Sequence, residues 1–392
     1  MPSSAPVLFS SRRLRSPLTA SWRVFATLLV ASSLWHQPGV TAAADASSWP
    51  LFRGNPQSTG TTAGQLPDGL DELWKFEVKG GAFEGTAAIV GGVVYLGDLD
   101  GAVRAWELSS GKLRWEKKFE SGFIASPAVR DGRIYLGDMD GTFFCLDAAG
   151  GDTVWKFATG AEIDSCANFH RGRVLVGSQD ATLYCFEAAG GQVVWRFTIG
   201  DQIRCTPTVV GDRAFVAGCD GKLHVVDLEK GTEVAGVEID GPTGVTPAAV
   251  GEFVYFGTEG GTVHCVNWKE ARTAWTYQPD KGSQGFRSSP AVTDDAVVIG
   301  GRNRQVLCLV PATGTLRWSF PAKQRVDSSP VIVGQRLYVG SADGRLYGID
   351  LSQGNKVWEF EAKGGFNSSP AVAEGKLVIA SDEGVVYCFG RK

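Results

Sequence analysis

The chain has 392 residues, 43% of them hydrophobic, with 51 glycines, 12 tryptophans and only 2 methionines. This composition is typical of many short strands joined by tight turns, and it argues against packed helices. The formal net charge is -4 and no basic run is present, so neither nucleic acids nor anionic membrane surfaces are expected as partners.

Residues 1–46 differ from the rest and predict a secretory signal peptide. Four arginines precede an apolar run over residues 24–34, and the small-residue stretch 41–46 follows that run. The expected cleavage positions are after Ala42, Ala44 or Ala46. The apolar run is short for a membrane span, so an uncleaved anchor is the less favoured alternative. Losing the four arginines would take the net charge from -4 to about -8.

Residues 47–69 form an N-terminal extension. It opens with Trp49-Pro50-Leu51-Phe52-Arg53-Gly54 and continues as a polar stretch rich in Thr and Gly up to Pro67. Apolar and polar residues do not alternate in it as they do in a strand. We expect its aromatic side chains to pack the extension against the domain that follows.

From residue 70 to the end, a unit of about 40 residues recurs eight times. Its closing tryptophan recurs at intervals of 41, 40, 40, 80, 43 and 40 residues, and Ala235 fills the tryptophan position inside the double interval. The tryptophans are Trp74, Trp115, Trp155, Trp195, Trp275, Trp318 and Trp358. Such a period predicts a β-propeller or a solenoid.

Each unit predicts four strands, which we call A to D. In the second copy they span residues 124–129, 133–136, 142–147 and 153–157. The turns Asp131-Gly132 and Asp140-Gly141 favour tight hairpins, so consecutive strands should be antiparallel. Strand A carries a proline at one fixed position in six copies, for example Pro127, and we expect the innermost strand to tolerate it because one side faces the central channel.

The two ends of the repeat region predict ring closure. The last copy, residues 366–390, supplies strands A, B and C but no strand D, and residues 72–77 read as a lone strand D with its tryptophan. Together the two fragments make one blade, which a ring needs and an open solenoid does not. The predicted fold is therefore an all-β, eight-bladed propeller of four-stranded antiparallel blades over residues 70–392.

The repeated tryptophans are expected to be structural. An aromatic residue on an outer strand packs most simply against the next blade, whereas a ligand-stacking platform is the alternative interpretation. The cysteines also follow the repeat. Five of them share one position with Ala105, Val225 and Gly348, which indicates a small buried packing site: Cys145, Cys185, Cys265, Cys308 and Cys388. Cys166 and Cys205 are the one pair for which a disulfide is considered.

The candidate binding residues lie three positions before the proline position, where the copies disagree. These positions, called the outer ring below, hold Glu84, Ile124, Asp164, Arg204, Gly244, Arg287, Asp327 and Asn367. Ion pairs between neighbouring copies, Asp164 with Arg204 and Arg287 with Asp327, are the simpler expectation. The alternative is a polar funnel that binds a ligand or an extended peptide. No nucleophile and base stand at a recognisable spacing, and the histidines form no metal-ligand pattern.

The repeat consensus, best seen in Ser328 to Trp358, resembles the pyrroloquinoline-quinone repeat across residues 70–390. That family includes quinone-dependent dehydrogenases and the non-catalytic BamB-type scaffolds of outer-membrane β-barrel assembly. The resemblance implies either function. The dehydrogenases typically place an adjacent Cys-Cys disulfide, a tryptophan and a calcium ion at the cofactor, and this chain has no adjacent cysteines and no tryptophan in its D–A loops.

The residues and the resemblance together favour an exported, non-enzymatic scaffold of the bacterial envelope. We expect it to be periplasmic, monomeric and without a lipid anchor, because no cysteine stands near the cleavage region. Its expected partner is an envelope protein or an extended peptide, and no cofactor is expected. The alternative is an alcohol or sugar dehydrogenase that uses pyrroloquinoline quinone with calcium.

Overall fold

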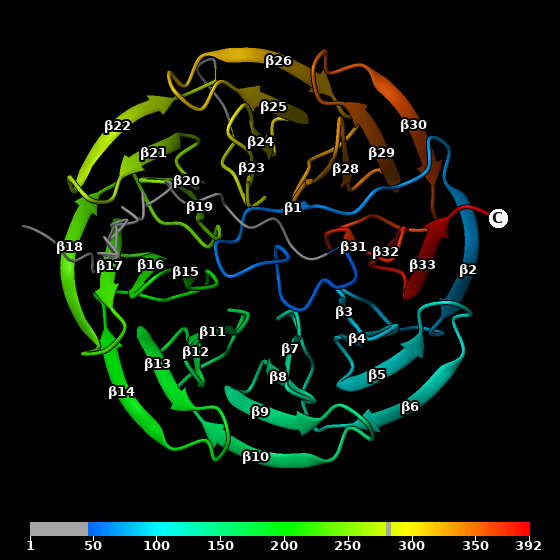
Figure 1. Cartoon of the computed structure of the whole chain (residues 1–392), viewed down its shortest axis with the longest axis horizontal. Helices are drawn as coiled ribbons and strands as arrows, with labels where there is room; N and C mark the ends of the chain where they lie inside the picture. The colour runs from blue at the N-terminus through cyan, green and yellow to red at the C-terminus, as the bar shows by residue number, and fades with distance from the viewer. Residues whose placement is uncertain (1–45, 280–283) are drawn as a thin grey trace, which may run out of the picture. The chain divides into compact units, whose positions relative to one another are not determined.

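In a computed structural model of the chain, which describes residues 46–279 and 284–392, the described residues form 33 strands and no helix. The strands make eight sheets that stand around a central axis, as Figure 1 shows. The predicted eight-bladed propeller is thus confirmed. The predicted signal peptide lies outside the described residues except for Ala46. None of the described segments is a helix long and apolar enough to cross a lipid bilayer.

Seven blades are continuous in sequence, each with its strands in the order A to D from the axis outward (Figure 1). Blades 1 and 2 are β3 Ala88–Val90, β4 Val93–Gly97, β5 Ala102–Glu107, β6 Leu113–Lys118, then β7 Ala128–Arg130, β8 Arg133–Gly137, β9 Thr142–Asp147, β10 Thr153–Ala158. Blades 3 and 4 are β11 Asn168–His170, β12 Arg173–Gly177, β13 Thr182–Glu187, β14 Val193–Thr198, then β15 Thr208–Val210, β16 Arg213–Ala217, β17 Lys222–Asp227, β18 Thr232–Glu238. Blades 5 and 6 are β19 Ala248–Val250, β20 Phe253–Gly257, β21 Val263–Asn267, β22 Arg272–Tyr277, then β23 Ala291–Val292, β24 Val297–Gly300, β25 Gln305–Leu309, β26 Leu316–Pro321. Blade 7 is β27 Val331–Val333, β28 Arg336–Gly340, β29 Arg345–Asp350 and β30 Lys356–Glu361.

Blade 8 combines the two ends of the repeat region, as predicted. Its strands A to C are β31 Ala371–Ala373, β32 Lys376–Ala380 and β33 Val385–Gly390, and its strand D is β2 Asp71–Glu77. The β2 and β33 strands are antiparallel, with Trp74 opposite Cys388. The N-terminal strand therefore covers what would otherwise be an open sheet edge.

Strand A is shorter than predicted and begins after the proline. In blade 2 the strand starts at Ala128, not at residue 124, so Pro127 precedes the ladder instead of lying in it. The explanation that a channel-facing strand tolerates proline was therefore wrong. The residues before the proline bond to the neighbouring blade, and the proline ends that irregular stretch where no backbone donor is needed.

The seven repeated tryptophans join adjacent blades. Each indole Nε1 donates to a backbone carbonyl on the other side of a blade interface, at 2.7 to 3.2 Å: Trp74 to Leu108, Trp115 to Ala148, Trp155 to Ala188, Trp195 to Leu228, Trp275 to Pro311, Trp318 to Leu351 and Trp358 to Leu70. Six rings also lie on the C–D turn glycine of the next blade. A Cβ on Gly231, for example, would lie 2.5 Å from the Trp195 ring. The glycines supply both the positive φ of the turn and the space for the indole.

The interface between blades 4 and 5 lacks both partners at once. Ala235 stands at the tryptophan position of blade 4, and Ala271, with φ of 52°, stands at the glycine position of blade 5. With no indole to accommodate, the turn tolerates a methyl group. Trp268 of blade 5 supplies an aromatic ring from the other side instead, with its centroid 5.5 Å from that of Phe215 in blade 4.

Residues 46–62, which we call the N-terminal plug, cross the centre of the ring (Figure 1). One strand of the plug, β1 Thr61–Thr62, pairs in parallel with β27. Backbone carbonyls of the plug accept hydrogen bonds from every blade: the donors are Ile89, Val129, Asn168, Val209, Ala249, Val292, Ile332 and Glu374. The extension thus ties all eight inner strands together at one end of the channel.

All eight cysteines are free in the structure. The considered Cys166 to Cys205 disulfide is therefore absent, and both thiols are buried in the packing next to strand A. The five cysteines of the shared repeat position are also buried, which confirms the predicted small packing site.

A candidate binding pocket at the channel mouth

The outer ring lines one pocket, of about 240 Å³, at the mouth of the channel. All eight outer-ring positions contribute, together with the residues two positions further along the chain, Phe52 of the plug and Glu259 of a B–C turn. These residues precede strand A, whereas the plug bonds to positions after the proline. The pocket and most plug contacts therefore lie at opposite ends of the inner strands, and Phe52 reaches the pocket from the plug.

The residue directly before the proline position forms a closed hydrogen-bonded circle, which we call the inner ring. The backbone N–H of each member donates to the side chain of the equivalent residue in the next blade, at 2.8 to 3.2 Å. The members are Thr86, Ser126, Cys166, Thr206, Thr246, Ser289, Ser329 and Ser369. Because the side-chain oxygens, and the Cys166 sulfur, act as acceptors in these bonds, the hydroxyl hydrogens of the serines and threonines are left free to donate to another group.

The serine before the inner ring serves the blade itself. Ser288 and Ser328 each accept the N–H of the last strand B residue, Gly300 and Gly340, at 3.1 Å. The two serines of the Ser-Ser-Pro motif therefore have different roles. The first is hydrogen-bonded to strand B of its own blade, and the second is hydrogen-bonded to the next blade. The sequence alone showed the motif but not this difference.

The charges of the outer ring are paired differently from the prediction. Neither Asp164 with Arg204 nor Arg287 with Asp327 forms an ion pair among the described residues. Asp164 accepts from Gln179 Nε2 at 2.9 Å, and Arg287 Nε lies 3.7 Å from a Glu259 carboxylate oxygen. The B–C turns supply these partners, so the pairing is within a blade or across to a turn and not along the ring.

Asp327 is held in the same way. Arg302 of the B–C turn donates to it at 3.1 Å, and Arg325 of the preceding loop donates at 3.0 Å. Its side chain is only 13% exposed, so two guanidinium groups compensate a largely buried carboxylate. The charge of Asp327 is therefore compensated by the protein itself.

Other polar groups of the pocket are not satisfied by the protein. Among the described residues, buried atoms without a hydrogen-bond partner include Arg204 Nε, Asp164 Oδ1 and Asn367 Oδ1, all from the outer ring. Glu84 has neither a hydrogen bond nor an ion pair in the described structure. Burial, followed by the charge of Asp164, raises the pKa of Glu84. Unpaired polar atoms concentrated in one cavity are typical of a binding site.

A buried arginine, Arg53, lies next to Phe52, the plug residue that lines the pocket. Arg53 in the plug is 1% exposed and donates from Nη2 to the carbonyls of Pro290 and Pro330, at 3.1 and 2.5 Å. It has no carboxylate partner among the described residues, and burial lowers the pKa of its guanidinium group. Its adjacent residue Phe52 separates it from the pocket and supplies the apolar floor.

Among the described residues, no hydroxyl or thiol of the inner ring is hydrogen-bonded to a carboxylate or a histidine. Cys166 carries the one thiol that lines the pocket. Burial raises the pKa of this thiol, and its sulfur accepts a hydrogen bond from the Ser126 N–H. No histidine lines the pocket among the described residues. The arrangement can bind and orient a polar ligand, and it offers no nucleophile with a base.

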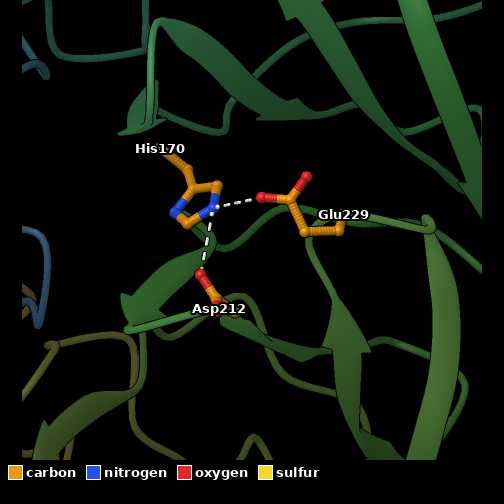
Figure 2. A group of neighbouring side chains, drawn as sticks. All are labelled: His170, Asp212 and Glu229. Carbon is orange, nitrogen blue, oxygen red and sulfur yellow. Dashed lines mark hydrogen bonds and ion pairs between the residues drawn. The ribbon is translucent and has the colours of Figure 1, made fainter.

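A second cluster lies between blades 3 and 4, where His170 meets Asp212 and Glu229 (Figure 2). Its Nε2 lies 3.4 Å from Asp212 and 3.3 Å from Glu229. Sequence reasoning missed this group because its members come from the end of β11 in blade 3 and from two turns of blade 4. Arg171 already pairs with both carboxylates, at 2.9 and 3.0 Å. The hydrogen bond from His170 holds the pKa of Glu229 below its usual value. The cluster is thus an ion-pair network between blades.

The other two histidines in the described part of the chain are strand side chains, as expected. His224 lies between Asp220 and Glu233, with 3.0 and 2.7 Å contacts, and His264 contacts Asp240 at 2.9 Å. Both are buried, and each carboxylate satisfies a ring nitrogen that burial would otherwise leave unpaired. They lie in different blades and do not converge on one site.

Solved structures of similar fold include a BamB protein and two dehydrogenases. The crystal structure of BamB from Moraxella catarrhalis is 20% identical, with a TM-score of 0.69 over 82% of this chain and 98% of that one. The quinohemoprotein alcohol dehydrogenase from Comamonas testosteroni is 13% identical, with a TM-score of 0.77 over 90% and 82%. A europium-containing methanol dehydrogenase is 11% identical, with a TM-score of 0.72 over 88% and 98%. At these identities the likeness concerns the fold.

Comparison at the level of sequence is more specific. No protein of curated function matches the chain. The family model described as outer membrane protein assembly factor BamB matches residues 67–165, 144–285 and 272–392, which together span the whole repeat region. The chain therefore belongs to the BamB-like family of pyrroloquinoline-quinone-repeat propellers.

Proposed function

We propose that this protein is an exported, non-enzymatic propeller that binds a protein partner in the bacterial cell envelope, as an assembly scaffold of the BamB type. The observation that carries the proposal is the channel itself. One end is tied by the plug, and the other holds a polar pocket with unpaired groups but no nucleophile and base. Hydrogen bonds between neighbouring blades and to the plug hold the ring together, so the loops at the pocket end can form a rigid face for a partner.

The leader supports the proposed location. Its basic residues, apolar run and small-residue stretch have the order of a secretory signal. Cleavage after Ala42 or Ala44 would leave Ala46 in place, and the Ala46 carbonyl accepts the Glu374 N–H at 2.9 Å. We therefore expect the mature chain to begin before Ala46 and to act as a periplasmic monomer without a lipid anchor.

The rival function is a dehydrogenase that uses pyrroloquinoline quinone with calcium, since two structures of similar fold are dehydrogenases. The residues present do not fit that cofactor. Phe52 is the aromatic residue of the pocket, and no tryptophan lines it among the described residues. No two of the eight free cysteines are adjacent in sequence. Glu259 and Asp327 in the pocket lie against arginines, and among the described residues no three acidic, histidine or cysteine side chains of the pocket come close enough together to hold a metal ion.

Two measurements on the purified mature protein test this proposal. Affinity capture from envelope extracts of the native host, followed by mass spectrometry, should recover the barrel component of the outer-membrane assembly machinery. Addition of pyrroloquinoline quinone and calcium should give no dye reduction with alcohols or aldoses above the level without protein. Robust turnover in the second assay, or recovery of no assembly component in the first, would overturn the proposal.

A further inference from the structure

The charges of the outer ring are distributed unevenly around the pocket. Glu84 and Asp164 come from blades 1 and 3 and flank Ile124, whereas Arg204 and Arg287 come from blades 4 and 6 and flank Gly244. In a ring of eight, blade 5 stands opposite blade 1. The gap between the two arginines therefore faces Glu84 across the pocket. Glu259 also lines the pocket and lies 3.7 Å from Arg287 Nε, so Arg204 is the arginine of this side that has no carboxylate partner among the described residues. The side of blades 4 to 6 thus carries two arginines against one carboxylate, and the side of Glu84 and Asp164 is anionic.

Gly244 leaves room beside the cationic side. A Cβ at this position would lie 3.2 Å from Arg204 Cβ and 3.6 Å from its Cδ, so the arginine stem already packs against the glycine backbone. A side chain at this position would crowd the Arg204 stem. Two arginines on either side of an open backbone position form a favourable site for a carboxylate.

The unsatisfied atoms have matching polarity. Arg204 Nε is a donor without an acceptor, whereas Asp164 Oδ1 and Asn367 Oδ1 are acceptors without donors. Buried polar atoms in this state cost free energy until a ligand pairs with them. A ligand that presents an anionic acceptor to the arginine side and N–H donors to the acidic side would satisfy all three. The hydroxyl hydrogens of the inner ring add donors for further ligand oxygens.

We propose that this pocket binds a small zwitterion, a short peptide with a free ammonium and a free carboxylate at its two ends. The carboxylate lies between Arg204 and Arg287 above Gly244, and the ammonium lies toward Glu84 and Asp164. The cavity of about 240 Å³ is smaller than the roughly 300–1,000 Å³ of typical ligand pockets, which suits a ligand of this size. The site lies on the face proposed above for the protein partner, but its test uses small ligands and no partner, so either proposal can fail without the other.

Three matched dipeptides test the proposal by calorimetric titration of the full mature protein. Glycylglycine carries both charges, N-acetylglycylglycine keeps the carboxylate alone, and glycylglycinamide keeps the ammonium alone. We expect glycylglycine to bind at least about tenfold more tightly than either of the others. Equal binding of the acetylated peptide would instead indicate a protein C-terminus and would overturn the proposal, as would no binding of glycylglycine up to about 10 mM.

Two variants assign the ends of the ligand. Arg204→Gln should remove the preference for glycylglycine over the amide, and Glu84→Gln should remove its preference over the acetylated peptide. Neither side chain forms a hydrogen bond or an ion pair in the described structure, so both variants should keep the unfolding midpoint of the parent protein. Lys156→Gln, which removes a charge on the outer strand of blade 2, is the matched control and should bind as the parent does. If it weakens binding as much as Arg204→Gln does, the proposal is wrong.

Discussion

The backbone N–H of Ser369 in the last blade donates to Thr86 Oγ1 in the first blade at 3.1 Å. This bond completes the inner ring, and it joins residues that are 283 positions apart in the chain. The neighbouring β2 and β33 pairing closes the same blade at its outer edge. The propeller is thus closed twice, once at the axis and once at the rim.

The inner ring predicts a specific effect of Thr86→Val. The substitution keeps the shape but leaves the buried Ser369 N–H without an acceptor, which should cost about 1 to 3 kcal/mol of unfolding free energy. Thr86→Ser keeps the acceptor and should restore most of the loss. Urea unfolding of the three proteins measures this difference. Equal stability of the valine and serine variants would show that the closing hydrogen bond contributes nothing.

The tryptophan contacts predict a larger loss for Trp195→Ala. The indole donates to Leu228 at 3.0 Å and covers Gly231, so its removal leaves a cavity between blades 3 and 4 and an unpaired carbonyl. We expect a loss of about 3 to 5 kcal/mol in denaturant unfolding. Val234→Ala, at a side chain that is 51% exposed, is the control and should change little. A loss below about 1 kcal/mol for the tryptophan variant would contradict the interface role.

Substitution of Gly60 in the plug by alanine should have a larger effect than substitution of Gly69, which follows the plug. Gly60 has φ of +64°, and a Cβ there would lie 1.8 Å from Arg53 Nη2, so Gly60→Ala should displace the arginine and loosen the plug. The backbone strain alone amounts to about 1 to 2 kcal/mol. At Gly69 a Cβ would meet nothing within 4 Å, so Gly69→Ala should be tolerated. The rates of limited proteolysis at the N-terminus compare the two variants. Equal resistance would show that the packing of Arg53 against Gly60 does not hold the plug in place.

Asp240 predicts an acid-dependent contribution to stability. Burial raises its pKa, but hydrogen bonds from Thr262, His264 and Thr258 outweigh burial and leave the pKa below its usual value. Because the folded pKa is the lower one, the stabilisation is present above the unfolded pKa of about 4 and is lost as pH falls through the folded value. The stability difference between the parent and Asp240→Asn should therefore shrink on acidification. A difference that is constant or grows toward low pH would contradict this sign.

The cysteines predict slow thiol labelling of the folded protein. Seven of the eight are buried, and burial raises the pKa of Cys145 to about 11 and of Cys205 to about 12. Cys219, which is partly exposed, should react first with a thiol reagent at neutral pH. After denaturation without reductant, all eight should react. A count of six would indicate a disulfide that the structure does not contain.

Most of the fold could be predicted from the repeat. The spacing of Trp74 to Trp358 and the complementary end fragments were enough to predict eight closed blades, since every copy repeats the same turn and packing residues. The course of the plug was not predictable. Its contacts with the blades use backbone carbonyls such as those of Pro50 and Gly60, and these leave no pattern of side chains to read.

The candidate site was predicted in position but not in pairing. The outer-ring positions were found because the copies differ there, and the structure places them around one pocket. The partners were misassigned because Gln179 and Glu259 lie in B–C turns, where turn chemistry was sufficient to explain the sequence. Only the folded propeller brings a B–C turn beside the start of strand A, in the same blade for Gln179 and in the next blade for Glu259, and this decides which charges remain unpaired.

The most direct test of the binding role is photo-crosslinking from defined positions in living cells. A crosslinking residue in place of Met139, which is 41% exposed on a B–C turn at the pocket end, is compared with one in place of Arg130 at the opposite end of the inner strand. A partner face around the pocket predicts that the outer-membrane assembly barrel is captured from position 139 and not from position 130. Capture from position 130 alone, or from neither position, would contradict a scaffold that binds through the pocket face.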